Sequence, residues 1–243
     1  MRTFETLGYE ETGNIARVRL KRERINMAMV RELTAVCDHL EDDSPCDVVV
    51  FQGAGDNFSL GIDFGEFKPN QVMDIHGFNK WEKLCVRVER LPKITIAAID
   101  GKAVGGGFQL ALVTDARIGT TRCCLNANEV RLGFLPGMAT FRLAKYVGLG
   151  HAKRIIMQSV EIGAEQGESL GLLNSVNDDL EAAITATIEA FEPIHPVTVQ
   201  LARRLLNESF ATDWENAIGN FLAAQHRAIS QTAFLDTLKS HQD

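Results

Sequence analysis

The stretch Gly101-Lys-Ala-Val-Gly-Gly-Gly-Phe-Gln-Leu-Ala-Leu-Val-Thr-Asp115 places a glycine-rich turn between two apolar segments. The strand-like run Ile94–Ile99 precedes it, and an apolar helical pattern begins at Phe108. A buried strand, a glycine turn and a buried helix leave unpaired backbone N–H groups at the helix start, where the helix dipole is positive. Because glycine has no side chain, a ligand can come close to this main chain. The pattern predicts a corner that can stabilise an oxyanion.

Three glycines alone also fit an ordinary tight turn between a strand and a helix. Their spacing does not match the dinucleotide pattern G-x-G-x-x-G, which needs its third glycine at Phe108 or later. The chain also lacks the phosphate-loop pattern G-x-x-x-x-G-K-[ST]. The functional interpretation therefore depends on two further segments.

A second glycine turn lies upstream, in Asn57-Phe-Ser-Leu-Gly-Ile-Asp-Phe-Gly-Glu-Phe67, after the apolar run Val48–Phe51. Glycine at position 61 marks a sharp turn, because only glycine enters left-handed conformations freely. We expect this turn to point the N–H of Ile62 into a cleft.

The third segment lies downstream and contains Glu129, four residues before Gly133, in an apolar neighbourhood. Burial of a carboxylate raises its pKa, which is typical of a catalytic acid or base. The alternative is a structural glutamate paired with Arg131 or Arg142.

These segments resemble the signature sequences of the crotonase, or enoyl-CoA hydratase/isomerase, superfamily. That superfamily shows F-S-A-G-A-D, then A-x-x-G-G-G-x-E-L-A-x-x-C-D, then E-x-x-x-G-x-x-P-G. The corresponding segments of this chain are Phe58–Asp63, Ala103–Asp115 and Glu129–Gly137. The resemblance extends in order from about residue 12 to at least residue 210. It implies an α/β spiral of ββα units, followed by C-terminal helices that pack in trimers.

Alternating strand and helix patterns independently indicate an α/β fold with parallel strands. The strand-like runs are Ile15–Leu20, Val48–Phe51, Ile94–Ile99 and Arg117–Gly119. The helix-like runs are Val30–Leu40, Met73–Arg90, Phe108–Leu112, His151–Gln158, Leu180–Phe191, Pro196–Ser209 and Asp213–Ser240. Only helical patterns follow residue 180, so we expect a crotonase-like core over residues 1–180 and a helical module over residues 181–243.

The resemblance also implies roles for individual residues. The backbone amides of Ile62 and Gly106 match the two oxyanion donors, and Glu129 matches an acid/base that moves protons on the acyl chain. The remaining substrate contacts would be Leu60, Asp63, Gly105, Gly107, Leu132, Pro136 and Gly137. The coenzyme A would bind through Lys21, Arg22 and Arg24.

Gln109 departs from the superfamily pattern, because hydratases of the superfamily have a glutamate at this position. A glutamine cannot ionise, so it can orient substrate or water only through hydrogen bonds. A single remaining carboxylate suits isomerisation, in which one group moves a proton between two carbons. Carboxymethylproline synthases share Gly-Phe-Gln at this point, which keeps decarboxylation and C–C bond formation open.

Composition bounds the class of protein. The 243 residues are 45% hydrophobic and 23% charged, with a net charge of −7, which argues against nucleic acid as the main partner. No apolar run reaches the roughly 20 residues of a membrane span. Five cysteines without a C-x-x-C pair indicate reduced thiols. We expect a cytoplasmic homotrimer or hexamer with no metal, and with coenzyme A only as part of the substrate.

The sequence thus predicts an enzyme that stabilises the enolate of an acyl thioester, with Glu129 as acid/base and Gln109 as an orienting group. Isomerisation of an enoyl-CoA is the first expected reaction, and hydration is the second. The alternatives are a decarboxylase or C–C bond-forming enzyme, possibly acting on a carrier protein, a β-diketone hydrolase, and a non-catalytic coenzyme A-binding subunit.

Overall fold

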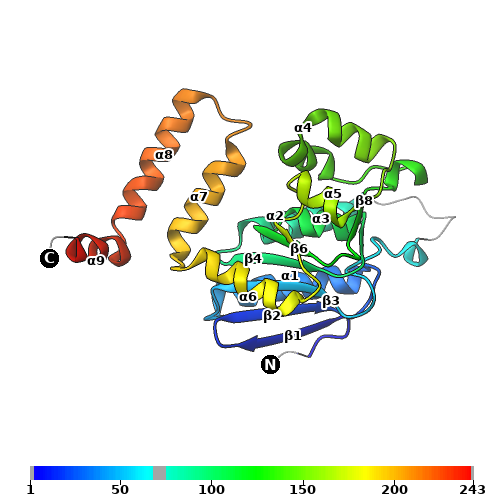
Figure 1. The fold of residues 1–243 in the computed structure, drawn as a ribbon, viewed down its shortest axis with the longest axis horizontal. Coiled ribbons are helices and arrows are strands. Elements are labelled where there is room, and N and C mark those ends of the chain that lie inside the picture. Colours follow the sequence, from blue (N-terminus) through cyan, green and yellow to red (C-terminus); the bar gives the residue numbers. More distant parts are fainter. Residues whose placement is uncertain (1–2, 68–74, 242–243) are drawn as a thin grey trace. The chain divides into compact units, whose positions relative to one another are not determined.

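The computed structural model describes residues 3–67 and 75–241, which form two compact units that meet in sequence between Phe191 and Glu192 (Figure 1). The first unit contains a six-stranded sheet in the order β1-β2-β3-β4-β6-β9. Its strands are β1 (Leu7–Thr12), β2 (Ile15–Leu20), β3 (Val48–Gly53), β4 (Ile94–Ile99), β6 (Ala116–Gly119) and β9 (Ser175–Val176). Strands β1 and β2 are antiparallel, and all other neighbours are parallel.

A second, smaller sheet consists of β5 (Lys102–Val104), β7 (Cys124–Asn126) and β8 (Ile162–Gly163). The chain enters it directly from the first sheet, since β5 follows β4 and β7 follows β6. Ser59 adds an isolated parallel bridge to Ala103 at the edge of β5. Each passage through both sheets is followed by helical structure, which is the ββα spiral that we expected.

Helices of the first unit follow these passages. They are α1 (Met27–Asp42), α2 (His76–Arg90), α3 (Gly106–Leu112), α4 (Ala139–Met157), α5 (Ala164–Ser169) and α6 (Leu180–Phe191), with 3₁₀ turns η1 (Phe64–Glu66) and η2 (Glu129–Leu132). Asn26 begins α1 by accepting a hydrogen bond from the N–H of Met29 at 2.9 Å. Gly148 interrupts α4 with a φ of 72°.

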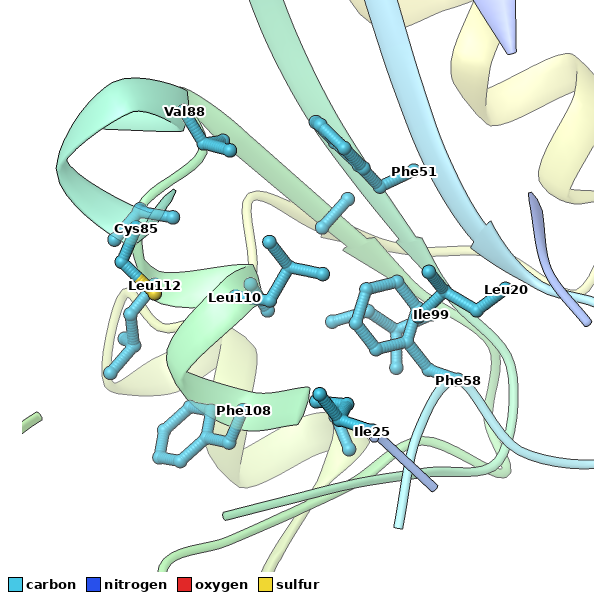
Figure 2. Packing of buried hydrophobic residues seen from close by; sticks show 14 of the residues in the cluster. Leu20, Ile25, Phe51, Phe58, Cys85, Val88, Ile99, Phe108, Leu110 and Leu112 are labelled. Carbon is cyan, nitrogen blue, oxygen red and sulfur yellow. The ribbon is translucent and has the colours of Figure 1, made fainter. Parts of the chain in front are cut away.

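The core lies on both faces of the six-stranded sheet, because alternate residues of a strand point to opposite faces. On one face, Val49 and Phe51 of β3 pack in the main hydrophobic cluster with α1, α2 and α3. Figure 2 shows this cluster, with Phe51, Phe58 and Leu110 close together. The opposite face includes buried Val48 and Val50. Helix α6 contacts β4 and β6, and its buried residues are Ala183 and Ile184.

The position of α6 differs from our expectation. We placed it in the C-terminal module, beginning at residue 181, but it packs against the sheet and belongs to the first unit. The physical reason is that a sheet with apolar residues on both faces needs a cover on each.

The second unit is helical, with α7 (Pro196–Glu208), α8 (Trp214–Ile229) and α9 (Thr232–Ser240). The continuous helix expected over 213–240 is interrupted between α8 and α9 at Ser230 and Gln231. Large apolar side chains remain exposed here, including Leu206, Phe210, Trp214 and Leu222. Within the described residues, no helix has the length and apolar character needed to cross a bilayer.

The predicted strands Ile15–Leu20 and Ile94–Ile99 are confirmed with the same bounds. Helix α2 begins at His76; Met73 and Asp74, which we included in it, lie outside the described residues. The short strands of the second sheet were not predicted. Three residues are too few for a periodic pattern to identify a strand.

We predict that Gly107→Ala destabilises the fold. A Cβ at Gly107 would lie 2.5 Å from the Cβ of Ser59 and 2.8 Å from its carbonyl oxygen. Overpacking of this kind costs about 1–3 kcal/mol, measured as a fall in the urea unfolding midpoint. Gly163→Ala is the matched control, because a Cβ there meets nothing within 4 Å. Equal midpoints for the two variants would contradict the close packing.

Candidate active site

Three neighbouring parallel segments, the strands β5 and β7 and the bridge residue Ser59, bring the predicted functional groups together. Ser59 pairs with Ala103, and Ala103 pairs with Leu125, so these residues lie side by side in one row. Ile62 follows Ser59 by three residues, Gly106 follows Ala103 by three, and Glu129 follows Leu125 by four. Since the three segments are parallel, the turns that follow them all leave the sheet at the carboxyl ends of its strands.

The two glycine turns are in direct contact. Gly61 has a φ of +83°, and a Cβ on it would lie 2.9 Å from the carbonyl oxygen of Val104 and 3.5 Å from the amide nitrogen of Gly106. Gly105 has a φ of +53°, which also favours glycine. A side chain at either position would be strained, and at Gly61 it would also separate the two turns.

The amides of Ile62 and Gly106 are both available to a ligand. The hydrogen bonds of the bridge between Ile25 and Ile62 use the carbonyl of Gly61 and the N–H of Asp63, not the N–H of Ile62. Gly106 is the first residue of α3, where an N–H has no partner within the helix. In the described part of the chain, neither N–H donates a hydrogen bond to a protein acceptor. Two free N–H groups on adjacent turns can both donate hydrogen bonds to one oxyanion.

The carboxyl group of Glu129 lies against the same turn. A Cβ on Gly105 would be 2.6 Å from Oε1 of Glu129, so the absence of a side chain at Gly105 makes room for the carboxylate. Glu129 is only 4% exposed. Its Oε2 atom is buried and has no hydrogen-bond partner among the described residues.

The structural alternative for Glu129, an ion pair with Arg131 or Arg142, is not found among residues 3–67 and 75–241. Arg131 donates to the carbonyl of Gln158 at 2.9 Å, and Arg142 pairs with Glu89 and Glu82. Desolvation by burial raises the pKa of Glu129 above its ordinary value, and the backbone hydrogen bond opposes this only in part. A buried carboxylate with an open oxygen and a raised pKa is suited to accept a proton from a substrate.

Gln109 lies on the same helix as Gly106, and the protein holds both ends of its amide. Its Oε1 accepts a hydrogen bond from Nε1 of Trp81 at 3.0 Å, and its Nε2 donates to Oε1 of Glu82 at 2.6 Å. One N–H and one lone pair remain for substrate or water. Sequence reasoning missed Glu82, because no motif singles out a glutamate in a helix with charged neighbours.

A cavity of about 150 Å³ opens beside Ile62. Its lining is mostly apolar and consists of Ile25, Asn26, Met27, Val30, Ile62, Glu66, Phe67, Gly77, Phe78 and Trp81. Phe67 and Phe78 also belong to an aromatic cluster with Phe64 and Phe134. Phe78 and Trp81 therefore connect the cavity lining to helix α2.

The three basic residues assigned to coenzyme A lie on the exposed segment between β2 and the bridge at Ile25. Lys21 donates to the carbonyl of Phe4 at 3.0 Å, and Arg22 pairs with Asp63 at 3.1 Å. This ion pair joins the basic segment to the Ile62 turn. Arg24 is exposed.

The other predicted contact residues are spread over the same region. The N–H of Leu60 donates to the carbonyl of Glu23, which fixes the strand before the turn. Gly107 packs against Ser59, and this contact gives it a packing role. In the segment after Glu129, Leu132 is exposed and Pro136 is buried, while Gly137 has a φ of +47°.

Comparison with known proteins defines the class of protein. The family model described as "Enoyl-CoA hydratase/isomerase" matches residues 10–241. The chain belongs to this family, as its three signature segments predicted.

Among individual relatives, the chain is 30% identical over 246 residues to the short-chain-enoyl-CoA hydratase of Clostridium acetobutylicum, covering 95% of this chain and 94% of that protein. It is 27% identical over 254 residues to the crotonyl-CoA hydratase of Syntrophomonas wolfei, covering 98% of each. The structure matches the crystal structure of an enoyl-CoA hydratase from Bacillus anthracis with a TM-score of 0.89 and 26% identity, covering 98% and 96% of the two chains.

We predict that Glu129 makes stability fall as the pH rises. Its folded-state pKa lies above the unfolded value of about 4.5, so the native state binds more protons between these two pKa values. Stability is highest below this window and is lost as the pH rises through the folded-state pKa. Glu129→Gln removes this loss, so its urea midpoint should exceed that of the wild type at pH 8 and match it near pH 4. A constant difference across this range would contradict the burial effect.

Proposed function

We propose that this chain catalyses enolate chemistry on an acyl thioester, with the thioester oxygen between the amides of Ile62 and Gly106. The support is the close approach of their turns, the two N–H groups without an acceptor among the described residues, and the nearby Glu129 carboxylate, whose Oε2 also has no partner there. A donor of this kind contributes about 2.7–4 kcal/mol to stabilising a developing oxyanion.

The reaction that fits a single carboxylate best is double-bond isomerisation. Glu129 removes the C2 proton of a 3-enoyl thioester, and the electron pair moves toward the thioester oxygen as a dienolate. The protonated Glu129 then returns the proton to C4, which gives the conjugated 2-enoyl thioester. No group is gained or lost, so no second acid or base is needed. The observation that carries this proposal is the buried Glu129 carboxylate, whose Oε2 has no partner among the described residues, together with a non-ionisable glutamine at position 109.

Hydration is the second candidate, and the names of the relatives favour it. Hydration needs an oriented water, for which Gln109 offers one remaining N–H and one lone pair. A panel of 2-enoyl, 3-enoyl, malonyl and saturated acyl-CoA thioesters, analysed by mass spectrometry and NMR, separates hydration, isomerisation and decarboxylation. Carrier-protein thioesters in the same panel test the alternative acyl donor. No turnover of any thioester would favour a non-catalytic binding subunit.

The apolar cavity is the proposed site of the acyl end. A cavity of about 150 Å³ lined by apolar side chains can hold a group the size of benzene. This size favours a short acyl chain.

We predict that Glu129→Gln lowers kcat by about 10² or more, with little change in ligand affinity. The substitution keeps the shape of the side chain but removes the proton acceptor. The assay is isomerisation of a short 3-enoyl-CoA, followed by absorbance of the conjugated product. Glu165→Gln, at an exposed position of α5, is the control. Activity of Glu129→Gln within a few-fold of the wild type would remove Glu129 from the mechanism.

We also propose that the chain assembles as a trimer or as a dimer of trimers. Helices α7, α8 and α9 contain no buried residue, and large side chains such as Phe210 and Trp214 are exposed by 70% and 75%. Apolar surface of this extent favours burial against another chain.

Light scattering should therefore give a mass of about 80 or about 160 kDa, from three or six chains of 26.8 kDa. A mass equal to that of one chain at micromolar concentration would contradict the assembly.

A further inference from the structure

Glu82 of α2 connects three parts of the candidate active site. Its Oε1 accepts hydrogen bonds from Nε2 of Gln109 at 2.6 Å and from the N–H of Met138 at 2.9 Å. Its Oε2 lies 3.5 Å from Nη1 of Arg142. One carboxylate thus links α2 to α3, which carries Gly106, and to the residue before α4, where the segment that begins at Glu129 ends.

The orientation of the Gln109 amide follows from its two partners. The Trp81 indole N–H can only donate, and Oε1 of Glu82 also accepts from the N–H of Met138, so it serves as an acceptor here. The carbonyl of Gln109 must therefore face Trp81, and its NH₂ group must face Glu82. A flipped amide would place two donors and two acceptors against each other.

Gly137 provides the space for this arrangement. A Cβ at this position would lie 2.2 Å from Oε1 of Glu82 and 3.0 Å from Oε1 of Gln109. Its φ of +47° also favours glycine. The segment between Glu129 and α4 therefore closes directly over the Glu82–Gln109 pair.

The surroundings of Glu82 argue against a purely structural ion pair. Arg142 has a bidentate partner in Glu89, with Nε–Oε1 and Nη2–Oε2 distances of 3.1 and 3.2 Å. Its contact with Glu82 is longer, and it leaves the other oxygen of Glu82 to Gln109 and Met138. The short contacts of Glu82 are therefore with the active-site segments.

We propose that Glu82 is a positioning residue for the reaction, which acts by fixing the amide of Gln109 beside the oxyanion site. This inference rests on the proposed function, because Gln109 matters only if a thioester is bound between Ile62 and Gly106. The fixed amide presents its remaining N–H and lone pair in one orientation. Glu82 itself does not need to touch the substrate.

A double-mutant cycle tests the proposal. Glu82→Ala should lower kcat at least tenfold and change KM by less than threefold, because Gln109 loses its orientation and not its place. Glu82→Gln keeps an oxygen acceptor and should retain at least a third of the wild-type kcat. In a Gln109→Ala background, Glu82→Ala should have no further effect on kcat, because a residue that acts through Gln109 has nothing left to orient.

Glu89→Ala is the matched control. It removes a glutamate from the same helix and a partner from the same Arg142, but it does not touch Gln109. We expect its kcat to stay within threefold of the wild type at a temperature where circular dichroism shows all variants folded. An equal loss in Glu89→Ala, or an equal effect of Glu82→Ala in both backgrounds, would show that the ion-pair network is structural and would overturn the proposal.

A gain in hydration rate distinguishes the proposed role of Glu82 from a packing effect. Gln109→Glu alone would place two carboxylates at hydrogen-bond distance, where like charges repel. Adding Glu82→Gln restores one carboxylate and one amide in exchanged positions. Hydration of crotonyl-CoA should be at least tenfold faster in the double variant than in Gln109→Glu. Equal rates would contradict the contact between residues 82 and 109.

These experiments distinguish a failure of this inference from a failure of the proposed function. If the wild type isomerises a 3-enoyl-CoA but the cycle is additive, only the role of Glu82 is wrong. If the thioester panel detects another reaction, the cycle is measured on that reaction with the same expectations. If the wild type turns over no thioester, both proposals are wrong.

Discussion

The candidate site depends on the register of two very short strands, β5 and β7, and of the bridge that joins Ser59 to β5. The row formed by Ser59, Ala103 and Leu125 sets where each following turn leaves the second sheet. A shift of one residue in any of these pairings would move an amide donor or the glutamate by about 3.3 Å and reverse the side from which it points. The larger sheet and its helices hold this small sheet in place, and the glycines at the turns allow the close approach that the register requires.

Burial of Glu129 illustrates how this arrangement favours chemistry at the expense of stability. A carboxylate oxygen without a partner in an apolar site is costly, because an unpaired buried charge loses its hydration. The fold tolerates this cost, and the carboxylate becomes more basic as a result. In the proposed reaction, a substrate proton would supply the missing partner. The N–H groups of Ile62 and Gly106 also have no acceptor among the described residues, and a developing oxyanion would accept a hydrogen bond from both.

The residues of the candidate site could be chosen from the sequence because they lie at or near glycine turns and match family signatures. Strand Ile94–Ile99 was predictable because it is an apolar run of strand length, and strand Ile15–Leu20 was predictable because apolar residues alternate with arginines in it. The row Ser59–Ala103–Leu125 was not, since register in three-residue strands is a property of tertiary packing. The same limit applies to Glu82. The role that we propose for it depends on a contact with Gln109, which lies 27 residues later, and no local pattern contains that information.

The most direct test of the account is the vibrational frequency of a bound thioester carbonyl. The probe is a 3-enoyl-CoA or a saturated analogue labelled with ¹³C at the thioester carbonyl, measured by Raman difference spectroscopy bound and free. Two N–H donors on the oxygen polarise the C=O bond, so the account predicts that the carbonyl stretch moves to lower frequency on binding. The shift should persist in Glu129→Gln, which leaves both amides in place. A bound thioester whose carbonyl stretch equals that of the free thioester in water would contradict the assignment of Ile62 and Gly106 as the oxyanion site.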